Sequence, residues 1–163
     1  LRIDPFHRFL INKYPELFTE INTLIEELTD QKTCLVHGDF SPKNMLVEKN
    51  GHIVLIDYEV AHWGNPVFDL AYCLGHLMLK AWHLKKPAEI LELISVFMAN
   101  YKGQVSNLLP HLGLMMLARM DGKSPVNYIQ DDTLKQIIRT TAINWIKGGD
   151  SGLNVLDAIK KQF

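Results

Sequence analysis

The sequence predicts an α+β fold that is predominantly helical and carries one small β-hairpin near its start. Two observations predict this class. Three short apolar runs lie between residues 34 and 57, and the pair Asn50-Gly51, a strong hairpin signal, joins the last two. Beyond residue 66 the apolar residues recur mostly at helical spacing between proline and glycine breaks. With 163 residues the chain is long enough for one domain and hardly for two, so we expect a single domain over 1–163.

The first predicted elements are two helices on either side of Pro15. Asp4-Pro5 is typical of an N-cap followed by proline in the first helical turn, and Pro15 ends that helix and starts the next. The second helix has apolar residues at helical spacing: Leu17, Ile21, Leu24, Ile25 and Leu28. Three strands are predicted after it, over 35–37, 45–48 and 52–57, and we expect these strands to be buried.

Helices make up the remainder of the prediction. Asn65-Pro66 starts a helix that runs to about Trp82 and is apolar on nearly every side, so we expect it to be central and buried. Four more helices are predicted: from Pro87 to near Gly103, from Pro110 to Asp121, over 131–147, and a short one after the linker 148–152.

The composition is that of an ordinary globular protein, with 47% apolar residues and a net charge of −1. Such a chain offers no basic face for a nucleic-acid polymer. Its longest apolar stretch is interrupted by polar and charged residues, so we expect no membrane span. Cys34 and Cys73 lie in apolar surroundings and are expected to be buried free thiols of a cytoplasmic protein.

Polar side chains gather at the ends of the predicted strands, where acceptors are costly without partners. Asp39 follows the first strand by two residues, in a loop broken by Gly38 and Pro42, which is the usual place for a catalytic group. If the next two strands pair across the turn, Asn44 and Asp57 face each other. An amide oxygen and a carboxylate suit Mg²⁺, which keeps phosphate oxygens and water in the rest of its shell.

The stretch "HGDFSPKN", starting at His37, followed by "IDYE", ending at Glu59, resembles the signature of the aminoglycoside phosphotransferase and choline kinase superfamily. This superfamily is the small-molecule branch of the protein-kinase-like fold. A further acidic motif of the family, "DP-x-x-D-L-A", is similar to "NPVFDLA" here, with Asp69 in place and Asn65 where aspartate is common. The resemblance covers about residues 33–75.

The resemblance implies that the chain is the C-terminal lobe of a protein-kinase-like fold, with the hairpin at the catalytic loop. It implies that Asp39 is the catalytic base, and that Asn44 and Asp57 hold the Mg²⁺ that bridges the phosphates of ATP. The implied reaction is ATP-dependent phosphate transfer to a hydroxyl of a small molecule.

Four other residues are expected to support this site. His37 is expected to bond within the loop, and Asp69 to accept hydrogen bonds from the loop backbone. Glu59 either completes a second metal site or is solvated. Ser41 stands where protein kinases commonly carry lysine or arginine, which favours a small-molecule acceptor.

Half of a kinase's phosphate-binding apparatus is missing from the sequence. There is no glycine-rich loop after a strand and no strand lysine paired with a helical glutamate. In the family these parts lie upstream, and the chain starts at Leu1 without a methionine. We therefore expect an N-terminal lobe upstream in the same protein, and little turnover by the isolated chain. The alternative is a non-catalytic kinase-like binding or regulatory module.

The acceptor cannot be assigned from the sequence. A cation–π cage is one alternative, with candidate residues Trp63, Trp82, Tyr101, Tyr128 and Trp145. Arg119 and Lys123 holding an anionic acceptor is another. "DGKS", residues 121–124, lacks the partner glycine of a P-loop. Cys73, His76 and His83 match no common zinc spacing and favour core packing.

Overall fold

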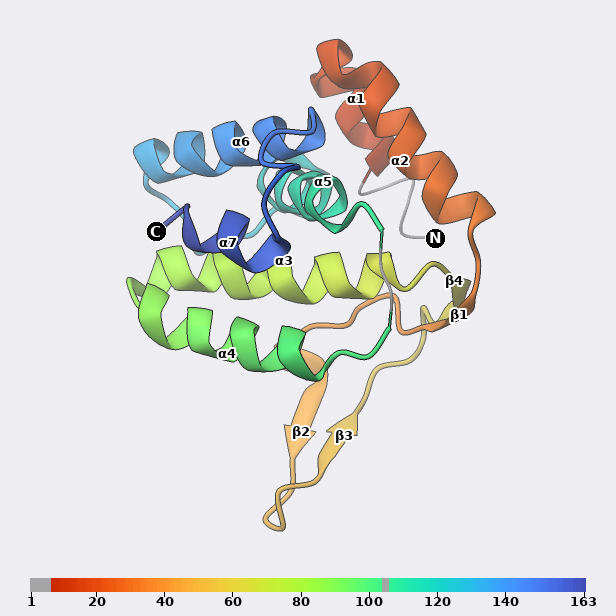
Figure 1. Ribbon diagram of the computed structural model, residues 1–163, viewed down its shortest axis with the longest axis vertical. Helices are drawn as coiled ribbons and strands as arrows, with labels where there is room; N and C mark the ends of the chain where they lie inside the picture. Colours follow the sequence, from red (N-terminus) through yellow and green to blue (C-terminus); the bar gives the residue numbers. More distant parts are fainter. Residues whose placement is uncertain (1–6, 104–105) are drawn as a thin grey trace.

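A computed structural model describes residues 7–103 and 106–163, and the predicted N-cap Asp4-Pro5 lies outside these residues (Figure 1). The α-helices are α1 (Phe9–Lys13), α2 (Phe18–Asp30), α3 (Val67–Leu84), α4 (Pro87–Asn100), α5 (Leu108–Asp121), α6 (Asp132–Ile146) and α7 (Val155–Lys160). Two short 3-10 helices are η2 (Pro15–Leu17) and η3 (Pro42–Asn44), and the strands are β1 (Cys34–Val36), β2 (Met45–Val47), β3 (Ile53–Leu55) and β4 (His62–Gly64). The predominantly helical α+β class is confirmed.

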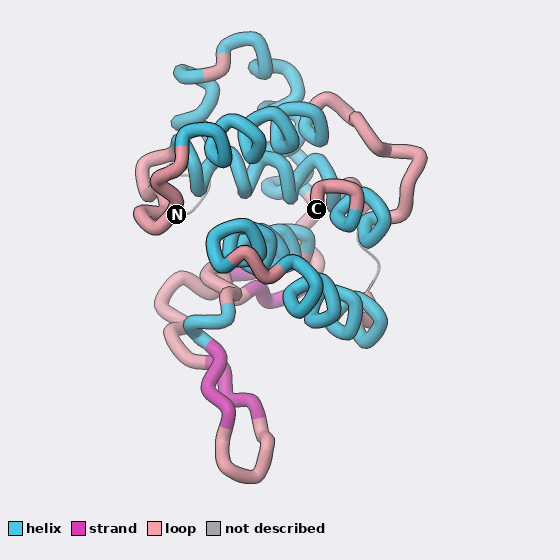
Figure 2. Tube along the Cα trace, turned by 90° about the vertical axis from the view of Figure 1, so that its left-hand side faces the viewer, coloured by secondary structure: helices cyan, strands magenta, loops and turns pink. Residues whose placement is uncertain are grey.

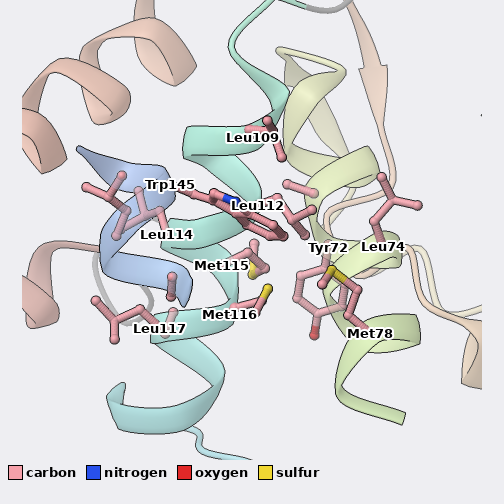
Figure 3. Packing of buried hydrophobic residues seen from close by; sticks show 14 of the residues in the cluster. Tyr72, Leu74, Met78, Leu109, Leu112, Leu114, Met115, Met116, Leu117 and Trp145 are labelled. Carbon is pink, nitrogen blue, oxygen red and sulfur yellow. The ribbon is translucent and has the colours of Figure 1, made fainter. Parts of the chain in front are cut away.

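Helix α3 lies at the centre of the hydrophobic core, as its apolar sequence predicts. It packs against α4 and α5, and α5 packs in turn against α6 (Figure 1). Figure 3 shows the side chains between α3 and α5, among them Met78, Met115 and Met116. The close approach of α6 to α5 depends on Gly113, because a Cβ there would lie 2.6 Å from the carbonyl oxygen of Ala142.

All five apolar residues predicted for the second helix are buried, four of them in α2 and Leu17 in the 3-10 turn η2 that precedes it. Helix α5 differs from the prediction, since it begins at Leu108 rather than at Pro110. Asn107 precedes it in the left-handed region, with φ of 54°. Pro110 then lies in the first turn, where its missing N–H has no helical partner to lose.

One buried carboxylate joins α1, α5 and α6. Asp121, at the end of α5, accepts hydrogen bonds from both Nε (2.7 Å) and Nη2 (2.9 Å) of Arg139 in α6. It also accepts from Lys13 Nζ (3.0 Å) and the hydroxyl of Tyr14 (2.6 Å), which lie at the end of α1. Burial alone would raise the pKa of Asp121, but these hydrogen bonds outweigh burial and hold its pKa well below the ordinary value.

The strands form two separate antiparallel pairs, β1 with β4 and β2 with β3. Strand β4 was not predicted, because its sequence, His62 to Gly64, is not an apolar run like those of the other three strands. The expectation that the strands are buried is wrong for the β2–β3 hairpin, which extends away from the helices in both views (Figures 1 and 2). Val47 and Ile53 are 71% and 65% exposed. A two-stranded ribbon has two faces, and no described helix covers either of them.

The register of the hairpin also differs from the prediction by one residue. Val47 pairs with Ile53, and the Ile56 N–H donates to the Asn44 carbonyl at 3.0 Å, so Asn44 lies opposite Ile56 rather than Asp57. The loop is centred on Asn50, since the Glu48 N–H still bonds to the His52 carbonyl. Three-residue loops of this kind end on a left-handed residue, here Gly51 with φ of 85°.

Candidate active site

The loop after β1 is held to α3 by one carboxylate. Asp69, in the first turn of α3, accepts hydrogen bonds from the backbone N–H of His37 (2.6 Å) and of Gly38 (2.9 Å). These are the hydrogen bonds that we predicted for Asp69. Burial raises its pKa above the ordinary value, although both N–H groups act in the opposite direction. The backbone that leads into Asp39 is therefore fixed at two consecutive residues.

Gly38 allows this loop to lie against the segment that follows β3. Its φ is 78°, a left-handed value, and an added Cβ would lie 2.7 Å from the carbonyl oxygen of Val60. A side chain at residue 38 would therefore be strained by the backbone conformation and would also clash. The glycine brings the two polar segments of the site together.

His37 connects the loop to the end of β3. Its Nε2 lies 2.9 Å from the carbonyl oxygen of Ile56, and its Nδ1 accepts a hydrogen bond from the Asp39 N–H at 3.3 Å. A carbonyl can only accept, so these contacts assign the proton to Nε2 and describe a neutral imidazole. His37 bonds within the loop, as predicted.

Asp39 is a buried carboxylate that contacts a lysine. Its side chain is about 5% exposed, and its Oδ2 lies 2.9 Å from Nζ of Lys43, whose own side chain is 62% exposed. This ion pair was not predicted from the sequence. Its signal is the spacing of four residues between Asp39 and Lys43, across the turn that starts at Pro42.

Asn44 and Asp57 are neighbours at the base of the hairpin. Nδ2 of Asn44, a buried residue, donates to the Asp39 carbonyl at 2.9 Å, so the oxygen of the amide is the atom left to bind a cation. Asp57 is exposed and has φ of 68°. In an extended strand, side chains alternate between the two faces. The left-handed conformation of Asp57 breaks this alternation, so the pairing of the strands does not determine the direction of its carboxylate. The backbone hydrogen bond from Ile56 to Asn44 holds the segment that leads into Asp57 beside Asn44.

The amide oxygen of Asn44 and the carboxylate of Asp57 are ligand types that suit a Mg²⁺ ion shared with a nucleotide. Such an ion takes one or two protein carboxylates and completes its shell with phosphate oxygens and water. Within residues 7–103 and 106–163, no group of three His, Cys, Asp or Glu side chains could hold a metal alone. Glu59 is exposed, two residues beyond Asp57.

Ser41 supplies a buried polar atom in the same loop. Its residue is 1% exposed, and its Oγ has no hydrogen-bond partner in the described structure. A buried hydroxyl without a partner costs free energy, so it is more typical of a functional loop than of a structural one.

Two cavities near the loop share Leu35, Val36, Phe40 and Asp69 in their lining. One, of about 260 Å³, lies between β1 and α4 and includes Phe97 and Tyr101. The other, of about 240 Å³, includes His37 and residues of the segment after β3. Asp39 lines neither cavity.

The candidate cage residues pair in different places among the described residues. The Trp82 ring lies 4.9 Å from that of Phe163, and the Tyr128 ring lies 4.8 Å from that of His83. Trp145 is in the core (Figure 3). The structure does not bring these rings together around one site.

The two cysteines are free. Cys73 is buried, and burial raises the pKa of its thiol to about 12, which makes it a poor nucleophile. Cys34 is only partly buried, contrary to the prediction, because it lies on the short pair of strands β1 and β4.

In a comparison with protein families, residues 7–94 match the phosphotransferase enzyme family. The match covers more than half of the chain, from α1 into α4, and includes the loop with Asp39 and its anchor Asp69. No curated protein matches the chain. Among the described residues, no helix is long and apolar enough to cross a membrane.

Proposed function

The chain belongs to the phosphotransferase enzyme family, and from that premise we propose that it transfers the γ-phosphoryl group of ATP to a hydroxyl of a small molecule. The observation that carries this proposal is the double hydrogen bond by which Asp69 fixes the backbone of His37 and Gly38. A group that orients a nucleophile must be held rigidly, since a displacement of about 1 Å can cost about 100-fold in rate.

Asp39 is the proposed base. Its carboxylate accepts the proton of the acceptor hydroxyl as the acceptor oxygen forms a bond to the γ-phosphorus. The bond from this phosphorus to the β,γ-bridging oxygen breaks, and ADP leaves with that oxygen. In a loose transition state of this kind, Asp39 serves mainly to orient the hydroxyl.

Mg²⁺ would supply positive charge to the phosphate oxygens in the transition state. The proposed ligands are the Asn44 Oδ1 and the Asp57 carboxylate. Asn44 is well suited to this task because its Nδ2 is already held by the Asp39 carbonyl. Glu59 is proposed as an outer partner of the same ion, because it follows Asp57 by two residues on an exposed segment.

Lys43 is proposed to exchange partners during the reaction. In the structure its ammonium group pairs with Asp39. A γ-phosphate in the site would offer Lys43 a more highly charged partner than Asp39. The side chain of Lys43 is largely exposed, so it can move to that partner. That exchange would release the carboxylate of Asp39 for the acceptor hydroxyl.

The remaining partners follow from the same proposal. The residues that bind the nucleotide base and cover its phosphates would come from an upstream N-terminal lobe of the same protein, in the arrangement of a protein-kinase-like fold. A cytoplasmic location would suit a protein with free thiols that uses ATP.

The test uses the full-length protein with ATP and Mg²⁺. Amino-alcohols, sugars, hydroxy acids and aminoglycosides are screened for phosphate transfer. Asp39→Asn should abolish turnover and leave nucleotide affinity within about twofold of the parent, because Asp39 acts on the acceptor. If no acceptor is phosphorylated, or if Asp39→Asn keeps the parent rate, the proposal is wrong. A protein that binds nucleotide but transfers nothing would be a non-catalytic module.

A further inference from the structure

Helix α3 carries polar residues along one face, although nearly all of its other side chains are apolar and buried. Asp69, His76, Lys80 and His83 recur at intervals of seven, four and three residues, which keeps them on one side of a helix. Asp69 is explained by its hydrogen bonds to the loop. His76, Lys80 and His83 are not explained by the loop, and they form a second polar region farther along α3.

His76 lies near the catalytic loop and near α5. Asp39 and Lys43 of the loop, Arg119 of α5 and Lys80 of α3 are all close enough to influence its pKa. Burial, the largest effect, lowers this pKa to about 4, so His76 is a neutral imidazole near pH 7. Its Nε2 is buried and has no hydrogen-bond partner in the described structure.

Tyr128 lies beside Lys80, in the segment between α5 and α6. Lys80 Nζ lies 3.9 Å from the centroid of the Tyr128 ring, a cation–π contact that holds the ammonium group in place. Arg119 is near enough to influence the pKa of Tyr128, and it donates a hydrogen bond to the carbonyl of Ser124. The hydroxyl of Tyr128 is also buried without a partner among the described residues.

We call His76, Lys80, Arg119 and Tyr128 the α3–α5 cationic cluster, after the two helices that carry its charged residues. Among the described groups that influence His76, Asp39 is the one anion, against three cations. Two other carboxylates of the helical part are held by their own cations: the buried Asp121 by Arg139 and Lys13, and the partly buried Asp150 by Lys161. The region beside the proposed base therefore combines excess positive charge with two unsatisfied polar atoms.

We propose that the acceptor of this phosphotransferase carries a negatively charged oxyanion group, which the α3–α5 cationic cluster binds while the hydroxyl lies at Asp39. This inference rests on the proposed function. Asp39 is near enough to His76 to influence its pKa, and Lys80 lies one turn beyond His76, about 6 Å along the helix axis. The proposal therefore requires an acceptor whose oxyanion and hydroxyl are separated by only a few bonds. Lys80 and Arg119 supply the charge, and the His76 imidazole and the Tyr128 hydroxyl supply neutral hydrogen bonds.

The test measures binding, so that it does not depend on turnover. The full-length protein is saturated with a non-hydrolysable ATP analogue and Mg²⁺, and three probes of equal length are titrated: 4-hydroxybutyrate, 1,4-butanediol and 4-amino-1-butanol. The anionic probe should bind at least about tenfold more tightly than the other two, since one favourable charge contact at a partly buried site is worth about 1.4 kcal/mol. Equal binding of the three probes, or preference for the amine, would overturn the proposal.

Two substitutions of Lys80 test the assignment. Lys80→Met keeps the aliphatic body of the side chain and should reduce the preference to about threefold or less. Lys80→Glu should reverse it in favour of the amine, which loss of structure alone would not do. Lys86→Met is the control, because Lys86 is an exposed lysine just beyond α3, and it should leave the preference unchanged. An unchanged preference in both Lys80 variants would contradict the assignment.

Tyr128→Phe separates ligand binding from folding. Removing a buried hydroxyl that has no partner should leave the melting temperature unchanged or raise it. It should still weaken 4-hydroxybutyrate binding by severalfold. If Tyr128→Phe is as stable as the parent and binds 4-hydroxybutyrate as tightly, Tyr128 is not part of the site.

The two proposals fail in different ways. Selective binding of the anionic probe without any phosphate transfer would preserve the cationic cluster and refute the phosphotransferase function. Phosphate transfer to cationic acceptors would preserve the function and refute an anionic acceptor.

Discussion

Replacing Asp69 with asparagine tests whether a single carboxylate fixes the loop that carries Asp39. The side chain of asparagine has nearly the same shape, but it offers one acceptor atom instead of two. Its amide oxygen can accept from either His37 or Gly38, and its NH₂ group would then face the other backbone N–H. One hydrogen bond is lost and one donor is left unsatisfied.

The expected cost follows from the two hydrogen bonds of 2.6 and 2.9 Å. A hydrogen bond to a charged group contributes about 1.5–3 kcal/mol. Asp69→Asn should therefore lower the free energy of unfolding by about 2 kcal/mol, and Asp69→Ala by more, since it removes both acceptors. The phosphate-transfer rate should fall by about 100-fold at saturating ATP, because the loop that positions Asp39 is released.

The assay combines urea unfolding, followed by circular dichroism, with the phosphate-transfer rate. Glu89→Gln is the matched control, because Glu89 is an exposed acid in the first turn of the neighbouring helix α4. It should change stability by less than about 0.5 kcal/mol. If Asp69→Asn unfolds and turns over like this control, Asp69 does not hold the loop.

Three further predictions concern single residues. Gly38→Ala should destabilise the protein more than Gly51→Ala, because both residues have positive φ but only at residue 38 would a Cβ meet the backbone; comparing the two unfolding free energies checks this. The difference in unfolding free energy between the parent and Asp121→Asn should be constant above about pH 5 and should shrink as the pH falls below about 4. The reason is that the pKa of Asp121 is depressed in the folded state. Unfolding measured at a series of pH values gives this difference. Asp57→Asn should raise the Mg²⁺ concentration that gives the half-maximal rate by at least about tenfold, the usual loss when a metal site loses a partner. Asparagine is chosen because it tolerates the left-handed φ of residue 57.

Each of these predictions has a contrary result. Equal destabilisation at residues 38 and 51 would mean that Val60 does not confine the loop. A stability difference at Asp121 that persists unchanged at pH 3 would exclude an ionised carboxylate as the source of the stabilisation. An unaltered Mg²⁺ requirement would remove Asp57 from the metal site.

The helical part of the fold could be predicted because its signals are local. Proline and the 3.6-residue period locate α2, α3 and α4 within a few residues, and Asp131 caps α6 through the Leu134 N–H. The hydrogen bonds of Asp69 were also predicted, because the motif that contains it defines both the helix and the loop.

Features that depend on pairing between distant segments could not be predicted. The register of the hairpin depends on whether the loop has two or three residues, and Asn50-Gly51 is compatible with both. The exposure of Val47 and Ile53 depends on whether another layer covers the hairpin, which apolar sequence does not reveal. Strand β4 forms only because β1 lies beside it. His76 and Lys80 had no motif, and the folding of α3 against α5 brings them near Arg119.

The proposed convergence of Asp39, Asn44 and Asp57 on one phosphate-bound metal is tested most directly by a crystal structure of the full-length protein with Mn²⁺ and a non-hydrolysable ATP analogue. The anomalous signal should lie at the base of the β2–β3 hairpin, within about 2.3 Å of the Asn44 Oδ1 and an Asp57 oxygen, on the side of the loop that carries Asp39. An ion bound away from both residues, or a nucleotide bound with no ion between these side chains, would contradict the proposed site.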